Sequence, residues 1–180
     1  MKTVKWILDP THSEVQFKVK HLMISTVTGK FQSFHVEAET AGDDFKSINN
    51  LLFTADVNSI RTNNEQRDIH LKSADFFDFD NFAEIRFIAS KYQHIQEDSY
   101  QLHGVLTIKN TSKHLTVNVE FGGTVIDSYG QTKAGFTISG QISRKEFGLT
   151  WNSVTEAGSV VVSDEVKING EIQLVKQELR

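Results

Sequence analysis

The feature that most constrains this fold is a two-residue alternation of apolar and polar side chains, repeated in about eight segments. It is clearest over Glu14–His21, where Val15, Phe17 and Val19 alternate with charged or amide side chains. This period places successive side chains on opposite faces of a β-strand, so each segment has one dry face and one wet face. The other segments are 34–39, 51–57, 85–89, 100–108, 115–121, 134–142 and 166–174.

Short polar connections join these segments, among them residues 97–99, 109–113 and 127–131, which are rich in Asp, Asn, Ser and Gly. Such residues are typical of tight turns, and short turns between successive strands favour an antiparallel meander. A meander of eight strands avoids unpaired edges when it closes on itself. We therefore expect an all-β fold, an eight-stranded antiparallel up-and-down barrel.

One segment, around residues 62–80, interrupts the strand pattern. Thr62 and Glu65 have the spacing of a capping box, which predicts a short helix that runs to about residue 72. We expect this helical insert to lie at one end of the barrel. Ile69 and Leu71 are its candidate docking residues.

Length and charge narrow the class of protein. A chain of 180 residues fits one domain, predicted to span residues 1–180. The net charge of −4 makes nucleic acid an improbable partner, because phosphate binding needs excess Lys and Arg. No apolar run is long enough for a transmembrane segment or a signal peptide, which predicts a cytoplasmic protein.

Motifs for catalysis or metal binding are missing from the sequence. The chain has no cysteine, and none of its seven histidines lies within eight residues of another, so no pair has metal-ligand spacing. There is also no nucleophile elbow and no glycine-rich phosphate loop. We expect no catalytic residue, no metal and no cofactor.

The shared dry face is the main candidate site. An eight-stranded barrel is either filled by its own side chains or holds one small ligand, and the alternation does not separate these two cases. Small residues at inward positions, such as Ala38, Ala55 and Gly104, leave room for a ligand. The expected lining of an apolar pore is Val15, Phe17, Val19, Phe34, Val36, Phe53, Phe87, Leu106, Val117, Val119, Phe136, Ile138, Val166 and Ile168.

Four basic residues are candidates for contacts with a polar head group. His21 continues the dry face of its strand, which predicts a core or cavity histidine. Arg67 and His70 lie in the predicted helix, where they either meet a ligand at the barrel mouth or fix the helix to the rim. Arg144 has the same two interpretations.

Seven runs of residues occur in this order along nearly the whole chain: WILDPTHS at 6–13, VQFKVKHL at 15–22, SIRT at 59–62, RDIHLKSADFF at 67–77, GVLTI at 104–108, RKEFGLTW at 144–151 and DEV at 164–166. Together they resemble the YceI-like family of bacterial lipid-binding proteins. The resemblance implies an extended, lipocalin-like barrel whose apolar pore holds a polyisoprenoid or a similar long-chain amphiphile. It also implies a protein that is often a dimer and has no established catalytic residues.

Three functions follow as hypotheses. The leading one is non-enzymatic binding, sequestration or transport of a long-chain lipid, such as a polyisoprenoid, an isoprenoid quinone or a fatty-acid derivative. The second is an enzyme that acts on such a lipid with His21 or His70 as the acid–base group. The third is a β-scaffold with a filled interior that binds a protein partner. A homodimer is compatible with each.

Overall fold

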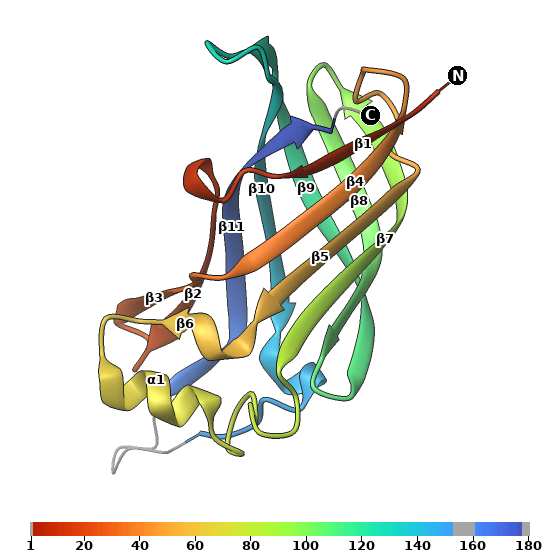
Figure 1. Ribbon diagram of the computed structural model, residues 1–180. Coiled ribbons are helices and arrows are strands. Elements are labelled where there is room, and N and C mark those ends of the chain that lie inside the picture. Colours follow the sequence, from red (N-terminus) through yellow and green to blue (C-terminus); the bar gives the residue numbers. More distant parts are fainter. Residues whose placement is uncertain (1, 153–160, 178–180) are drawn as a thin grey trace.

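The structure, a computed structural model, describes residues 2–152 and 161–177. Its strands form one antiparallel sheet that closes into a ring because β1 pairs with both β4 and β11 (Figure 1). This confirms the closed, eight-stranded antiparallel barrel. Its strands, in ring order, are β1 (Thr3–Leu8), β4 (Phe34–Ala41), β5 (Asn50–Asp56), β7 (Glu84–Gln96), β8 (Ser99–Ile108), β9 (Thr111–Ile126), β10 (Thr132–Ser143) and β11 (Val162–Lys176).

A flap of three further strands extends the sheet beyond the ring. Strand β11 pairs with β1 near its C-terminal end and with β2 (Glu14–His21) along its first part. Strands β1 and β2 therefore lie one after the other along the same edge, separated by the 3-10 turn η1 (Pro10–His12). Strand β3 (Ser25–Phe31) pairs with β2, and β6 (Ile60–Arg61) pairs with β3.

The eight alternating segments of the sequence are all strands, but β2 belongs to the flap and β1 takes its place in the ring. Strands β1, β3 and β6 were not expected from the pattern. β3 lacks a clear apolar face because the ring of Phe17 from β2 lies over Gly29. A Cβ atom at Gly29 would come within 2.2 Å of that ring, so a larger side chain has no room there.

The end of the barrel near the N-terminus is filled by side chains. Trp6 is fully buried, and its indole N–H donates to the hydroxyl of Thr40 at 3.0 Å. The ring of Phe45, from the loop between β4 and β5, contacts the rings of Trp6 at 4.5 Å and Phe136 at 4.9 Å. Ala38 pairs with Trp6 in the sheet and is 1 % exposed, so it is buried in this packed end of the barrel.

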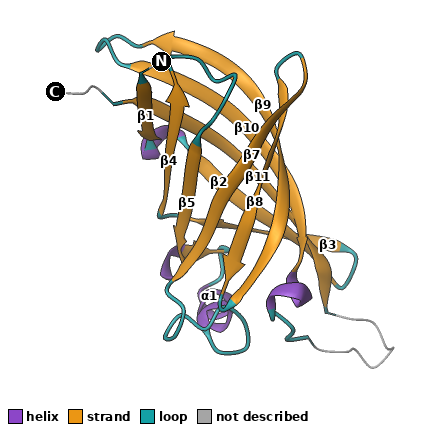
Figure 2. Ribbon diagram, turned by 90° about the vertical axis from the view of Figure 1, so that its right-hand side faces the viewer, coloured by secondary structure: helices purple, strands orange, loops and turns teal. Residues whose placement is uncertain are grey.

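The helix α1 (Glu65–Lys72) lies at the opposite end of the barrel (Figure 2). Its N-cap is Asn64, whose side-chain oxygen accepts the backbone N–H of Arg67 at 3.0 Å, so the prediction of Thr62 as the cap was wrong. Asn63 adopts a positive φ of 63°, and this turn brings Asn64 to the cap position. The Thr62 hydroxyl instead donates to Asp68 at 2.6 Å.

The two predicted docking residues of α1 differ in their surroundings. Leu71 is half-buried and packs against the core, as expected. Ile69 is 60 % exposed, so it does not dock the helix. Asp68 and Leu71 are three residues apart and share the face of α1 toward the barrel, whereas Ile69 lies off that face. Within the described residues, no helix has the length and apolar character needed to cross a bilayer.

Candidate binding cavity

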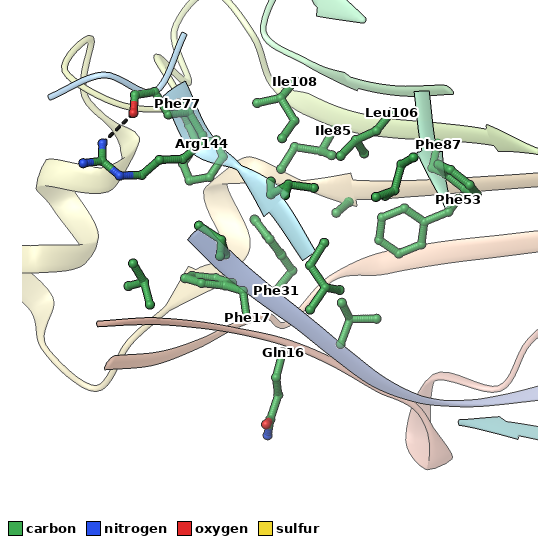
Figure 3. A pocket seen from close by; sticks show the side chains of 18 of the residues that line it. Gln16, Phe17, Phe31, Phe53, Phe77, Ile85, Phe87, Leu106, Ile108 and Arg144 are labelled. Carbon is green, nitrogen blue, oxygen red and sulfur yellow. Dashed lines mark hydrogen bonds between the residues drawn. The ribbon is translucent and has the colours of Figure 1, made fainter. Parts of the chain in front are cut away.

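The barrel encloses a cavity of about 610 Å³. This volume lies within the usual range of ligand pockets, about 300–1,000 Å³. Figure 3 shows Phe17 and Phe31 on one side of it and Phe53, Phe87 and Leu106 beyond them. The side chains of the dry face therefore do not fill the barrel over its whole length.

Of the fourteen residues expected to line a pore, the structure places all but Phe34 along this cavity. Phe34 faces inward as predicted but packs beside Phe53, with 5.9 Å between the ring centroids. Alternation predicts which face a side chain is on, and it does not predict how far along the barrel the open space reaches. Gly104 adds no space, because the ring of Phe87 lies over it.

Most of the polar residues of the lining lie at the α1 end. Thr62, Asn64, Arg67 and His70 come from α1 and the residues just before it, and Arg144 directly follows the last residue of β10. Asn64 is exposed to solvent and also lines the cavity, so the cavity opens at this end. The result is an apolar space with a polar rim.

Arg67 is held against the rim by Thr62. Its Nε donates to the Thr62 hydroxyl at 2.8 Å, and its Nη2 donates to the Thr62 carbonyl. Asp68 accepts the backbone N–H of Thr62 at 2.8 Å and its hydroxyl at 2.6 Å. Thr62 and Asp68 are both buried. A guanidinium has five N–H groups, so Arg67 keeps donors that the described residues do not use.

His70 lies one turn after Arg67 in an aromatic cluster. Its Nε2 is 2.8 Å from Asp75 Oδ2, and its ring contacts the rings of Trp151 at 4.7 Å and Phe76 at 5.1 Å. These contacts fix the position of the imidazole at the rim.

Arg144 is 3 % exposed and donates to four backbone carbonyls. They belong to Leu149, Trp151 at 2.8 Å, Ser163 at 2.8 Å and Val162 at 3.1 Å, and one of these bonds is drawn in Figure 3. Burial lowers the pKa of Arg144, an effect that the nearby Asp164 opposes. Arg144 thus fixes the segment after η3 (Arg144–Phe147) to the start of β11.

His21 differs from its expected place in a core or cavity. It lies at the end of β2, where the chain turns at Leu22 with a positive φ of 52°, and its side chain is exposed at the edge of the cavity. Within the described residues, the imidazole of His21 has no hydrogen-bond partner, and that of His70 bonds to a carboxylate. Neither histidine is paired with a nucleophilic side chain there.

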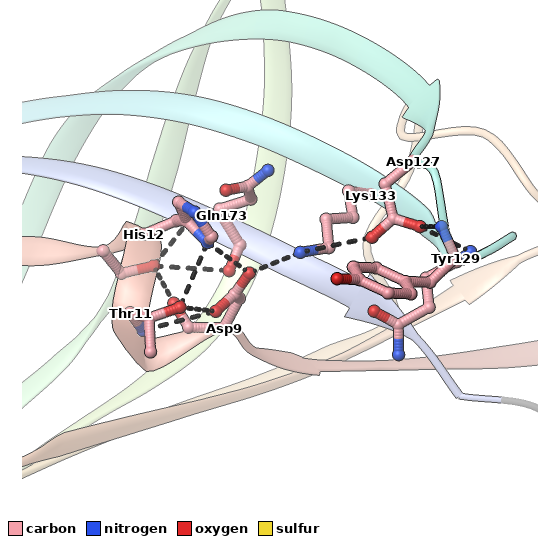
Figure 4. Close-up of polar contacts among 9 residues, drawn as sticks. Asp9, Thr11, His12, Asp127, Tyr129, Lys133 and Gln173 are labelled. Carbon is pink, nitrogen blue, oxygen red and sulfur yellow. Dashed lines mark hydrogen bonds and ion pairs between the residues drawn. The ribbon is translucent and has the colours of Figure 1, made fainter.

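A buried polar cluster outside the cavity was missed in the sequence (Figure 4). Asp9 is 8 % exposed and accepts Lys133 Nζ at 2.7 Å, and it also contacts His12 Nδ1 at 2.8 Å and the Thr11 hydroxyl at 2.9 Å. Burial favours a higher pKa for Asp9, but these hydrogen bonds together hold the pKa well below its usual range. The cluster fixes η1 to β10. Lys133 is 124 residues from Asp9 in the sequence, so no local motif could predict that the two side chains meet.

The family can be assigned from the sequence of nearly the whole chain. The model of the YceI-like domain matches residues 6–174. The chain belongs to the YceI-like family. A relative in Staphylococcus epidermidis, a UPF0312 protein, is 38 % identical over 166 residues, which are 91 % of this chain and 92 % of that protein.

Solved structures of YceI-like proteins have the same fold. The YceI protein of Campylobacter jejuni is 32 % identical, with a TM-score of 0.74 over 95 % of this chain and 97 % of that one. A polyisoprenoid-binding domain from Saccharophagus degradans, implicated in plant cell wall breakdown, has a TM-score of 0.65 over 96 % and 98 % of the two chains. The sequence identity to the Saccharophagus degradans domain is 14 %, so this similarity shows a shared fold only.

Proposed function

We propose that this YceI-like protein binds a long-chain amphiphilic lipid of the polyisoprenoid, isoprenoid quinone or fatty-acid class, and sequesters or transports it without chemical change. The observation that carries this proposal is the apolar cavity of about 610 Å³ with its one polar rim. An amphiphile has the same division into a long apolar part and a polar end. The name of the Saccharophagus degradans domain supports a polyisoprenoid as the first class to test.

The energetics of burial favour such a ligand. Each methylene group moved from water into the cavity contributes about 0.8 kcal/mol. Ordering a flexible chain opposes binding, so only part of this free energy appears as affinity. In the proposed complex, the apolar residues of the lining contact the chain, and His21, Arg67, His70 and Arg144 are the candidates for head-group contacts.

The direct test is organic extraction of the purified protein followed by mass spectrometry, and then titration of the delipidated protein with geranylgeraniol. A lipid recovered in stoichiometric amount, or saturable binding of one molecule, supports the proposal. Turnover of the added lipid would contradict the non-enzymatic role. Absence of any lipid together with absence of binding would favour a scaffold for a protein partner. A homodimer stays a prediction, which the molar mass in solution tests.

A further inference from the structure

Apart from one tyrosine, the ionisable side chains of the described cavity lining are all basic. Beyond the phenol of Tyr92, those in the described part of the chain are Lys20, His21, Arg67, His70 and Arg144, with no Asp or Glu among them. The protein as a whole has a net charge of −4, so the cavity lining is more basic than the rest of the chain.

His70 and Arg144 both contact Trp151 at this end of the cavity. The His70 ring contacts the Trp151 ring at 4.7 Å, and Arg144 donates to the Trp151 carbonyl at 2.8 Å. Arg67 precedes His70 by one turn of α1. Lys20 is different, because its ammonium group donates to Thr26 on the neighbouring strand β3.

Three carboxylates close in sequence to these residues lie outside the lining, and each has a hydrogen-bond partner other than the two arginines. Asp68 accepts two hydrogen bonds from Thr62, and Asp75 bonds to His70. Asp164 accepts the Ser143 hydroxyl at 2.6 Å and the Lys145 backbone N–H at 3.0 Å.

Within the described residues, no ion pair involves Arg67 or Arg144. Their positive charge therefore adjoins an apolar cavity without a carboxylate in direct contact.

We propose that the α1 end of the cavity binds an anionic head group, a phosphate or a carboxylate, and so selects charged lipids over neutral ones. This inference rests on the proposed function. Guanidinium groups form strong, charge-assisted hydrogen bonds with both kinds of oxyanion. The apolar walls lower the local dielectric constant, which strengthens the attraction. A neutral hydroxyl in the same place brings no opposite charge to the two arginines.

The test compares two probes that share one chain, geranylgeranyl phosphate and geranylgeraniol, on the delipidated protein at low salt. We expect the phosphate to bind at least about tenfold more tightly, and the difference to shrink as salt screens the charges. Palmitate and hexadecanol form a parallel pair. A preference in only one pair identifies which oxyanion the site takes.

Arg67→Gln is the informative variant, because the amide can still donate to Thr62 while the positive charge is removed. We expect it to lower the affinity for geranylgeranyl phosphate about tenfold and to leave that for geranylgeraniol unchanged. Lys18→Gln is the matched control, since it removes one positive charge from exposed β2 outside the lining, and it should change neither affinity. Arg144 is less suitable for substitution, because loss of its four hydrogen bonds to backbone carbonyls would also destabilise the folded protein.

The outcomes separate this inference from the proposed function. Equal affinities for phosphate and alcohol, and for palmitate and hexadecanol, would overturn the anionic head group and leave lipid binding intact. A loss of phosphate affinity in Lys18→Gln equal to that in Arg67→Gln would show a general charge effect, and would also overturn the assigned site. If none of the four probes binds, the proposed function itself fails.

Discussion

At the scale of single residues, Asp9 links the pH dependence of stability to one cluster. Its pKa in the folded protein lies below the ordinary value of about 3.9, so its contribution to stability is present above that pH and is lost as the pH falls below about 4. We expect Asp9→Asn to lower the urea midpoint at pH 7 and to make it less sensitive to acid below pH 4.

The control for Asp9 is Glu37→Gln, which removes a carboxylate from an exposed pair with Lys5 at 3.9 Å. Exposed pairs contribute little to stability, so this variant should behave like the wild type at pH 7. Equal midpoints for the two variants at pH 7 would contradict the role assigned to Asp9.

Tyr92 gives a second prediction at this scale. In the part of the chain that the structure describes, its hydroxyl is the one buried side-chain polar atom without a hydrogen-bond partner, and burial raises its pKa. Its ring stacks on Tyr100 at 4.6 Å, a contact that phenylalanine can keep. We expect Tyr92→Phe to stabilise the delipidated protein by about 1–3 kcal/mol in urea melts, because a desolvated hydroxyl is removed.

Tyr129→Phe is the control for Tyr92, since Tyr129 is 89 % exposed and its hydroxyl is free to bond to water. Its urea midpoint should match that of the wild type. A loss of stability in Tyr92→Phe would mean that the hydroxyl has a partner, and the prediction would be wrong.

At the scale of elements, α1 depends on two different polar contacts at its start. Asn64 caps the helix, so Asn64→Ala should lower the free energy of unfolding by about 0.5–2 kcal/mol. Thr62→Ala should lower it further, because the buried Asp68 and the side chain of Arg67 both lose the Thr62 hydroxyl. Thr62→Ser keeps the hydroxyl and is the control. If Asn64→Ala is the more damaging variant in urea melts, the interpretation of Thr62 fails.

At the scale of the whole molecule, the barrel has a packed end and an open cavity, and the two should respond differently to added volume. Val166 is half-buried in the lining, so Val166→Trp should weaken lipid retention with little change in the urea midpoint. Ala38 lies in the packed end, and Ala38→Phe should cost about 1–3 kcal/mol of stability through overpacking.

Val105 provides the matched control for Val166, because it is 43 % exposed and outside the lining. Val105→Trp should change neither lipid retention nor stability. Destabilisation by Val166→Trp as large as that by Ala38→Phe would show a filled core in place of a binding cavity.

The sequence by itself determined the strands with a dry face and their closure into a barrel. The alternation at Val15, Phe17 and Val19 arises because one face of the strand is buried. Positions on that face carry apolar side chains and positions on the other face carry polar ones, so the sequence shows the pattern directly. The capping-box spacing of Thr62 and Glu65 predicted a helix near residues 65–72, although its N-cap is Asn64. The alternation also put the inward-facing residues of the cavity lining on the correct face.

Only the tertiary structure decided where the space lies and which polar groups meet. Phe45 fills one end of the barrel, while the chain leaves the other end open beside Arg67 and Arg144, and neither result follows from alternation. Asp9 and Lys133 are far apart in sequence, and they meet only because β1 and β10 lie on opposite sides of β11. Contacts of this kind depend on how the strands are ordered around the ring, and a period of two residues carries no information about that order.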